Sequence, residues 1–135
     1  NMKLHNVAMS GAGNHIISSL VIRKVLELLK SGIDKEDICV IVQWSGIYRF
    51  DRIVPKKLGN SAQRPVYIEN RSTGKKRFDP PDSENEWIMC AGARQEGVWP
   101  HLYSFMSKEQ AFMETTENIL RTQWFLKSNN IRVIL

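Results

Sequence analysis

The sequence predicts a single α/β domain with a short parallel sheet and flanking helices. Two long stretches carry apolar residues at spacings of three and four, which predicts helices over 14–30 and 107–128. A nearly unbroken run of β-branched type over 38–43 predicts a buried strand covered on both faces, as in a parallel sheet. Because strand-like and helical segments alternate along the chain, helices are expected to cross between parallel strands.

In the first part of the chain, a short strand is expected over 4–9, ending at a turn of small residues over 10–14. The first helix follows and is expected to stop at Gly32, which can adopt the left-handed conformation. With the strand over 38–43, these elements predict a βαβ unit with a right-handed crossover.

The second part begins with a long irregular insertion, expected at about 51–106. Ser107, with Gln110 three residues later, fits a capping box and opens the second helix. The positions expected in the core of that helix are Ile119, Leu120 and Trp124. The chain then closes with an apolar strand over 131–135.

Composition limits the class of protein. The 135 residues, 42% hydrophobic and 24% charged, are typical of one globular domain over 1–135. No apolar run approaches the roughly 20 residues of a membrane helix, and no signal-peptide pattern is present, so a cytoplasmic location without membrane contact is expected. Cys39 and Cys90 are expected to be buried free thiols, with a single disulfide as the alternative. No Cys/His cluster exists, so neither a metal nor a cofactor is expected.

The net charge of +5 comes mainly from basic residues between Arg49 and Arg77. Such a segment is either a solvated loop surface or a patch that binds nucleic acid or another acidic partner. Few aromatic side chains lie among these charges, which makes nucleic-acid binding the weaker interpretation.

Two strand ends could carry chemistry, because ligands of parallel sheets bind at the carboxyl ends of the strands. At the first, Gly11 and Gly13 allow a tight turn, and the following helix presents free N–H groups that suit an anion or a developing oxyanion. At the second, polar and aromatic residues follow the strand over 38–43, and Arg49 could pair with a carboxylate or phosphate. The structural alternative is an ordinary turn at the first strand end, and an Arg49 side chain in a structural ion pair at the second.

These segments resemble the central portion of the SGNH/GDSL-type hydrolases. The stretch Asn6–Asn14 is similar to the family's second conserved block, which implies that Gly11, or else Gly13, donates to an oxyanion. Ser45 stands where the third block has an asparagine. Gly11, Asn14 and Ser45 are then the remains of the oxyanion side, and they are expected to converge around one pocket, with Gly11 beside Ser45. The combination GAGN, VQWSG and LRTQWFL is similar to a branch found in viral and environmental sequences. The resemblance implies a truncated three-layer sandwich of the flavodoxin-like type.

The family's G-D-S and D-x-x-H blocks are absent from these 135 residues. The resemblance therefore implies hydrolysis of an ester, such as an O-acetyl group, by a domain that is incomplete or inactive. A substitute pair would be Ser10 as the nucleophile and His101 as the base. The alternative is a non-catalytic binding or assembly module on the same scaffold, because shortened sheet edges favour homo-oligomers.

Overall fold

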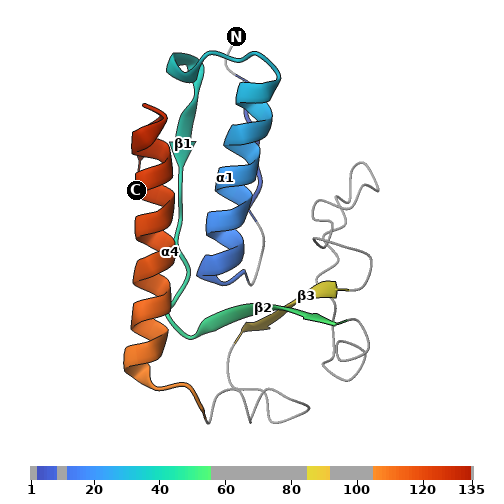
Figure 1. Ribbon diagram of the computed structural model, residues 1–135, viewed down its shortest axis with the longest axis vertical. Helices are drawn as coiled ribbons and strands as arrows, with labels where there is room; N and C mark the ends of the chain where they lie inside the picture. Colours follow the sequence, from blue (N-terminus) through green and yellow to red (C-terminus); the bar gives the residue numbers. More distant parts are fainter. Residues whose placement is uncertain (1–2, 9–11, 56–84, 92–104, 135) are drawn as a thin grey trace.

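The computed structural model describes residues 3–8, 12–55, 85–91 and 105–134 of the chain (Figure 1). These residues form a mixed α/β arrangement in which two long helices lie beside a short sheet. The elements, in order, are α1 (Asn14–Lys30), η1 (Lys35–Asp37), β1 (Cys39–Ile41), β2 (Arg49–Pro55), β3 (Asn85–Ala91), α4 (Lys108–Ser128) and β4 (Arg132–Ile134).

Both helices have the predicted ends. The Ser107 side chain accepts a hydrogen bond from the Gln110 backbone N–H, 3.0 Å away, and so caps α4. At the other ends, Gly32 and Asn130 adopt left-handed φ values of 83° and 54°. The backbone N–H of the next residue, Ile33 or Ile131, then reaches back to a carbonyl of the last turn. Local sequence signals therefore set the length of each helix.

The described strands form two separate pairs. β1 and β4 are parallel, with Cys39 opposite Arg132 and Ile41 opposite Ile134, so the predicted short parallel sheet is present as a pair of strands. β2 and β3 pair antiparallel from Arg49 opposite Ala91 to Pro55 opposite Asn85. The predicted insertion therefore contains a regular strand pair, formed because two β-favouring runs far apart in the sequence satisfy each other's backbone groups.

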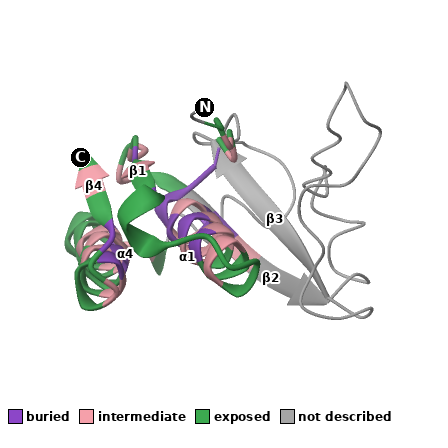
Figure 2. Ribbon diagram, turned by 90° about the horizontal axis from the view of Figure 1, so that it is seen from above, coloured by how far each residue is buried: buried purple, intermediate pink, exposed green. Residues whose placement is uncertain are grey.

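Both helices pack on one face of the β1–β4 sheet (Figure 2). The core joins Val21 and Val25 of α1 to Leu126 of α4, and Val40 and Val133 from the strands pack against it. The opposite face of the sheet exposes Cys39, Ile41, Arg132 and Ile134. The prediction of a strand covered on both faces is therefore wrong for β1, and the two helices and the β1–β4 sheet form two layers.

Two further expectations fail near this sheet. Residues 4–8 of the predicted first strand form no strand, and Met9 lies outside the described residues. Instead, the Asn6 side chain accepts the Ala8 backbone N–H at 2.9 Å, a local bond that competes with strand pairing. Cys39 is a free thiol but is exposed rather than buried, because its position in β1 alternates with that of the inward-facing Val40. The Cys90 side chain lies outside the described set.

The packed face of α4 also differs from the prediction. Leu120 and Trp124 are exposed, and Ile119 is only half-buried. Instead, α4 buries Ala111, Thr122 and Leu126. The two helices approach closely at Thr122: its hydroxyl donates to the hydroxyl of Ser18 on α1 at 2.7 Å, and both side chains are fully buried.

Neither of the two long helices in the described part of the chain is long and apolar enough to span a bilayer.

Candidate functional site

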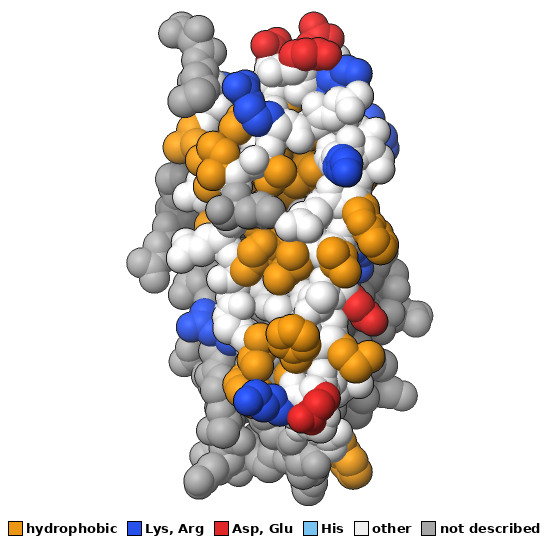
Figure 3. All heavy atoms as spheres, turned by 90° about the vertical axis from the view of Figure 1, so that its left-hand side faces the viewer, with side chains coloured by type: hydrophobic (Ala, Val, Ile, Leu, Met, Phe, Trp, Pro, Cys, Tyr) orange, Lys and Arg blue, Asp and Glu red, His pale blue; other side chains and the backbone are white. Residues whose placement is uncertain are grey.

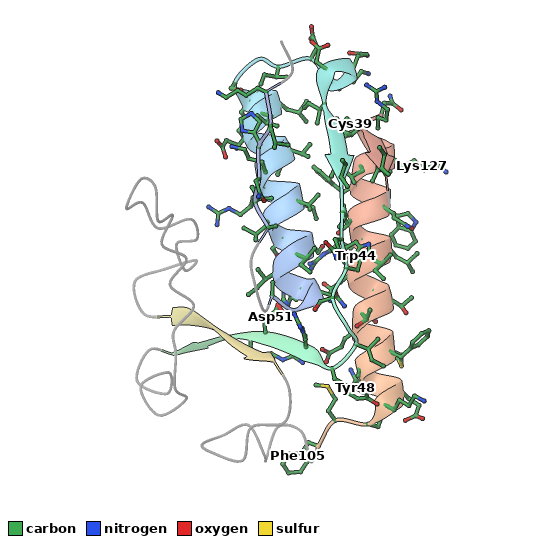
Figure 4. The ribbon with its side chains drawn as sticks, turned by 180° about the vertical axis from the view of Figure 1, so that it is seen from behind. Cys39, Trp44, Tyr48, Asp51, Phe105 and Lys127 are labelled. Atoms are coloured by element: carbon green, nitrogen blue, oxygen red, sulfur yellow. The ribbon has the colours of Figure 1, made fainter. Side chains whose placement is uncertain are left out.

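The first strand end proposed from the sequence lies at the beginning of α1, where the residues after β1 and the start of β2 meet (Figure 4). Gly13 is the N-cap residue of α1 and has an extended backbone, with φ −82° and ψ 170°. Gly13 has no side chain with which to cap the helix, so the first backbone N–H groups of α1 need acceptors from elsewhere.

Asp51 of β2 supplies one of these acceptors. Its side chain is 1% exposed, and Oδ2 accepts the Ile16 backbone N–H at 2.6 Å. A negative charge at this end of a helix also interacts favourably with the helix dipole. Among the described residues, the other carboxylate oxygen, Oδ1, has no hydrogen-bond partner. Asp51 is therefore a cap for α1 that is delivered by a strand 35 residues further along the chain.

Burial sets the protonation of this carboxyl. Removal from water raises the pKa of Asp51 from 3.8 to about 6, although the Ile16 N–H bond and the Arg52 charge act in the opposite direction. His15 is in the same neighbourhood, and its pKa is lowered by burial and by the charges of Arg121 and Arg52. His15 is therefore neutral at neutral pH, whereas Asp51 is ionised only above about pH 6.

Gly13 makes room for Asp51. A Cβ atom at this position would collide with Asp51 Oδ1 and would lie 2.6 Å from the Arg49 carbonyl oxygen. The glycine is therefore needed for the close approach of β2 to α1 rather than for an unusual backbone angle. Gly13 was predicted as the second candidate for an oxyanion donor, but its surroundings are already occupied by oxygen atoms.

Asn14 and Ser45 lie together, as predicted from the two segment ends. The Ser45 backbone N–H donates to Asn14 Oδ1 at 2.8 Å, and Asn14 Nδ2 donates to the Ser45 carbonyl at 3.1 Å. Asn14 Nδ2 also lies 3.2 Å from Thr115 Oγ1 on α4. The buried Asn14 amide thus links α1 both to the segment after β1 and to α4. Its oxygen and its nitrogen are both engaged in these hydrogen bonds.

The remaining predicted site residues are divided between described and undescribed parts of the chain. The Ser45 hydroxyl is buried and has no partner among the described residues, as is also true of the Trp44 indole N–H. Arg49 begins β2, and its side chain is exposed. Ser10, Gly11 and His101 lie outside the described residues, so the predicted Ser10–His101 pair and the predicted approach of Gly11 to Ser45 stay predictions.

An ion pair closes the side of this region that faces α4. Both terminal oxygens of Glu114 accept from Arg52 Nη2, at 2.8 and 2.7 Å. Further along the same helix interface, Arg121 donates to the Ser18 hydroxyl at 3.1 and 3.0 Å. These contacts hold β2, α1 and α4 in place relative to one another, so the two arginines have a structural role.

Sequence reasoning missed Asp51 because it was placed at the start of an irregular insertion. The available signal was the presence of Phe50, Ile53 and Val54, which favour a strand, on either side of this carboxylate. The described residues contain no group of three histidine, cysteine or acidic side chains that could hold a metal ion.

A second candidate surface is the outer face of α4. We call the exposed Phe112, Met113, Leu120 and Trp124 the α4 stripe. Phe112 and Trp124 are 62% and 66% exposed, which is unusual for side chains of this size. Figure 3 looks onto this side of the molecule and shows hydrophobic side chains gathered along its length.

Comparison with protein-family models, curated proteins and solved structures finds no match to this chain. The resemblance to SGNH/GDSL-type hydrolases therefore stays a prediction that is carried by the sequence motifs alone.

Proposed function

We propose that this chain is a non-catalytic binding and assembly module whose contact surface is the α4 stripe. The observation that carries the proposal is the exposure of two aromatic side chains, Phe112 and Trp124, on one regular helix. Exposed apolar groups gathered on one face mark interaction sites, and aromatic residues often supply much of the binding energy there.

The chemistry at the beginning of α1 supports a non-catalytic role. An oxyanion hole needs free donors where negative charge develops. Here the Ile16 N–H is already bonded to the Asp51 carboxylate, and the Asn14 amide is bonded to Ser45 and Thr115. Above about pH 6, the Asp51 charge would also repel an oxyanion at this end of the helix.

Ester hydrolysis remains the alternative function, together with the three-layer sandwich that the resemblance implies. It would use Ser10 and His101, with Ser45 as the remaining donor. The buried Ser45 hydroxyl, which has no partner among the described residues, is the observation that favours it. A cytoplasmic location belongs to either proposal, because Cys39 is an exposed free thiol that a reducing compartment would preserve.

The first experiment measures hydrolysis of short-chain nitrophenyl esters by the wild-type chain and by the Ser10→Ala and His101→Ala variants. We expect the same rate for all three proteins as for buffer. Turnover by the wild-type chain that Ser10→Ala abolishes would overturn the non-catalytic proposal and establish the hydrolase.

The second experiment tests the surface with a fluorescent dye that binds exposed apolar groups. The matched variants are Leu120→Ser on α4 and Leu26→Ser on α1, since these leucines are 37% and 40% exposed. At low protein concentration, we expect Leu120→Ser to reduce dye binding and Leu26→Ser to leave it nearly unchanged. Equal effects of the two changes would mean that the α4 stripe is not a distinct binding surface.

A further inference from the structure

The α4 stripe has a charged residue at each end, and the two charges are opposite. Glu109 lies in the first turn of α4, and Lys127 lies in the last. They are separated by 18 residues, which is five turns of an α-helix and about 27 Å, so both project in the same direction. Figure 4 shows Lys127 pointing outward from the helix. The line joining these two charges runs along the exposed face.

The residues of this face are arranged almost symmetrically about the middle of the helix at Asn118. Glu109 and Lys127 lie nine residues on either side of it, Phe112 and Trp124 lie six, and Thr116 and Leu120 lie two. An antiparallel copy of the same helix, centred at the same point, therefore brings aromatic residues to the level of aromatic residues. It also brings the acidic end of one helix to the basic end of the other.

We propose that the partner of the α4 stripe is a second copy of this chain, with the two α4 helices packed antiparallel about a two-fold axis that passes the exposed face at the level of Asn118 along the helix. The inference rests on the proposed function and names the partner of that surface. In this arrangement, Glu109 of each copy faces Lys127 of the other. A parallel arrangement would place like charges together at both ends, which is destabilising.

The expected dimer is modest in strength. A strip of helix about 27 Å long and about 10 Å wide is smaller than the roughly 800 Å² that each partner buries in a standard interface. Self-association is therefore expected to be weak, with dimers replacing monomers only as the protein is concentrated. Large aromatic side chains at matched levels supply most of its stability.

The experiment uses sedimentation velocity on the full chain over a range of concentrations. Glu109→Lys alone and Lys127→Glu alone each replace both opposite-charge contacts of the dimer with like-charge contacts. We expect each variant to dimerise roughly tenfold more weakly than the wild type. An equimolar mixture of the two variants restores opposite charges at both ends, so we expect it to recover dimerisation. The double variant Glu109→Lys/Lys127→Glu should recover it as well.

Two control variants make the same changes of charge away from the α4 stripe. Glu36→Lys lies in η1, and Lys30→Glu lies in the last turn of α1, as Lys127 does in α4. We expect both to dimerise like the wild type. Circular dichroism of every variant checks that the helices are intact before the dissociation constants are compared.

Three results would overturn the self-pairing. The first is a wild-type chain that is monomeric at all concentrations. The second is a dimer that the single charge reversals leave unchanged. The third is a pair of weakened variants that do not recover when they are mixed. The ester and dye measurements do not depend on dimerisation, so a failure of the self-pairing is distinguishable from a failure of the proposed function.

Discussion

Replacement of the Asp51 carboxyl by an amide should remove a pH-dependent part of the stability. Asp51→Asn keeps an oxygen that can accept the Ile16 backbone N–H, which in the wild type donates to Oδ2 at 2.6 Å. It also removes the charge from a side chain that is 1% exposed. The variant therefore retains the cap on α1 while avoiding the burial of an ionised group.

The magnitude follows from the pKa. The pKa of Asp51 is raised by burial from 3.8 to about 6. Between these pH values, the folded chain holds a proton that the unfolded chain has released, so the free energy of unfolding falls as the pH rises through the window. This contribution is complete below the ordinary pKa and is lost by the time the pH exceeds about 6. Roughly two pKa units correspond to about 3 kcal/mol.

Urea denaturation at several pH values, from about pH 4 to about pH 8, measures this effect. We expect the stability of Asp51→Asn relative to the wild type to increase by about 2–3 kcal/mol over that range. Asp34→Asn, which makes the same chemical change at an exposed carboxylate before η1, is the matched control. Parallel pH profiles for Asp51→Asn and the wild type would refute the reasoning and show that the buried carboxyl does not titrate as proposed.

Three further substitutions test the packing and the caps, all by chemical denaturation. Gly13→Ala should destabilise the fold by about 2–3 kcal/mol, because the new Cβ would collide with Asp51 and the Arg49 carbonyl. Gly46→Ala should be nearly neutral, because the space around Gly46 is open. Similar values for the two variants would contradict this account. Asn14→Ala should cost about 2–3 kcal/mol, since it leaves backbone groups of Ser45 without their partners, and a neutral effect would mean that water replaces the amide. Ser107→Ala should cost about 1 kcal/mol and reduce the helical circular dichroism signal, and an unchanged signal would show that the cap is dispensable.

Much of the local structure was predictable because local groups decide it. Ser107 accepts the Gln110 N–H and Gly32 adopts a left-handed backbone, so both helices have the predicted limits. The meeting of Asn14 with Ser45 was also foreseen from the two segment ends. The role of Asn14 was not foreseen, because its hydrogen bonds depend on which backbone and side-chain groups of other segments lie next to its amide.

Apolar spacing was a poor guide to the packed face of α4. Leu120 and Trp124 fit a helical period, yet α4 buries Ala111, Thr122 and Leu126 instead. Periodicity shows that a helix has faces but does not say which of them a neighbour covers. The close contact of Ser18 with Thr122 depends on a hydrogen bond between two helices, which no pattern within one helix contains.

The sequence by itself determined two helices with their ends and the two strand-forming segments at β1 and β4. These features depend on backbone preference and on neighbours a few residues away. Only the tertiary structure decided that Asp51 caps α1 and that Phe112 and Trp124 of α4 are exposed. Both depend on which distant segments come together, because burial and the pairing of charges are properties of the surroundings rather than of the residue.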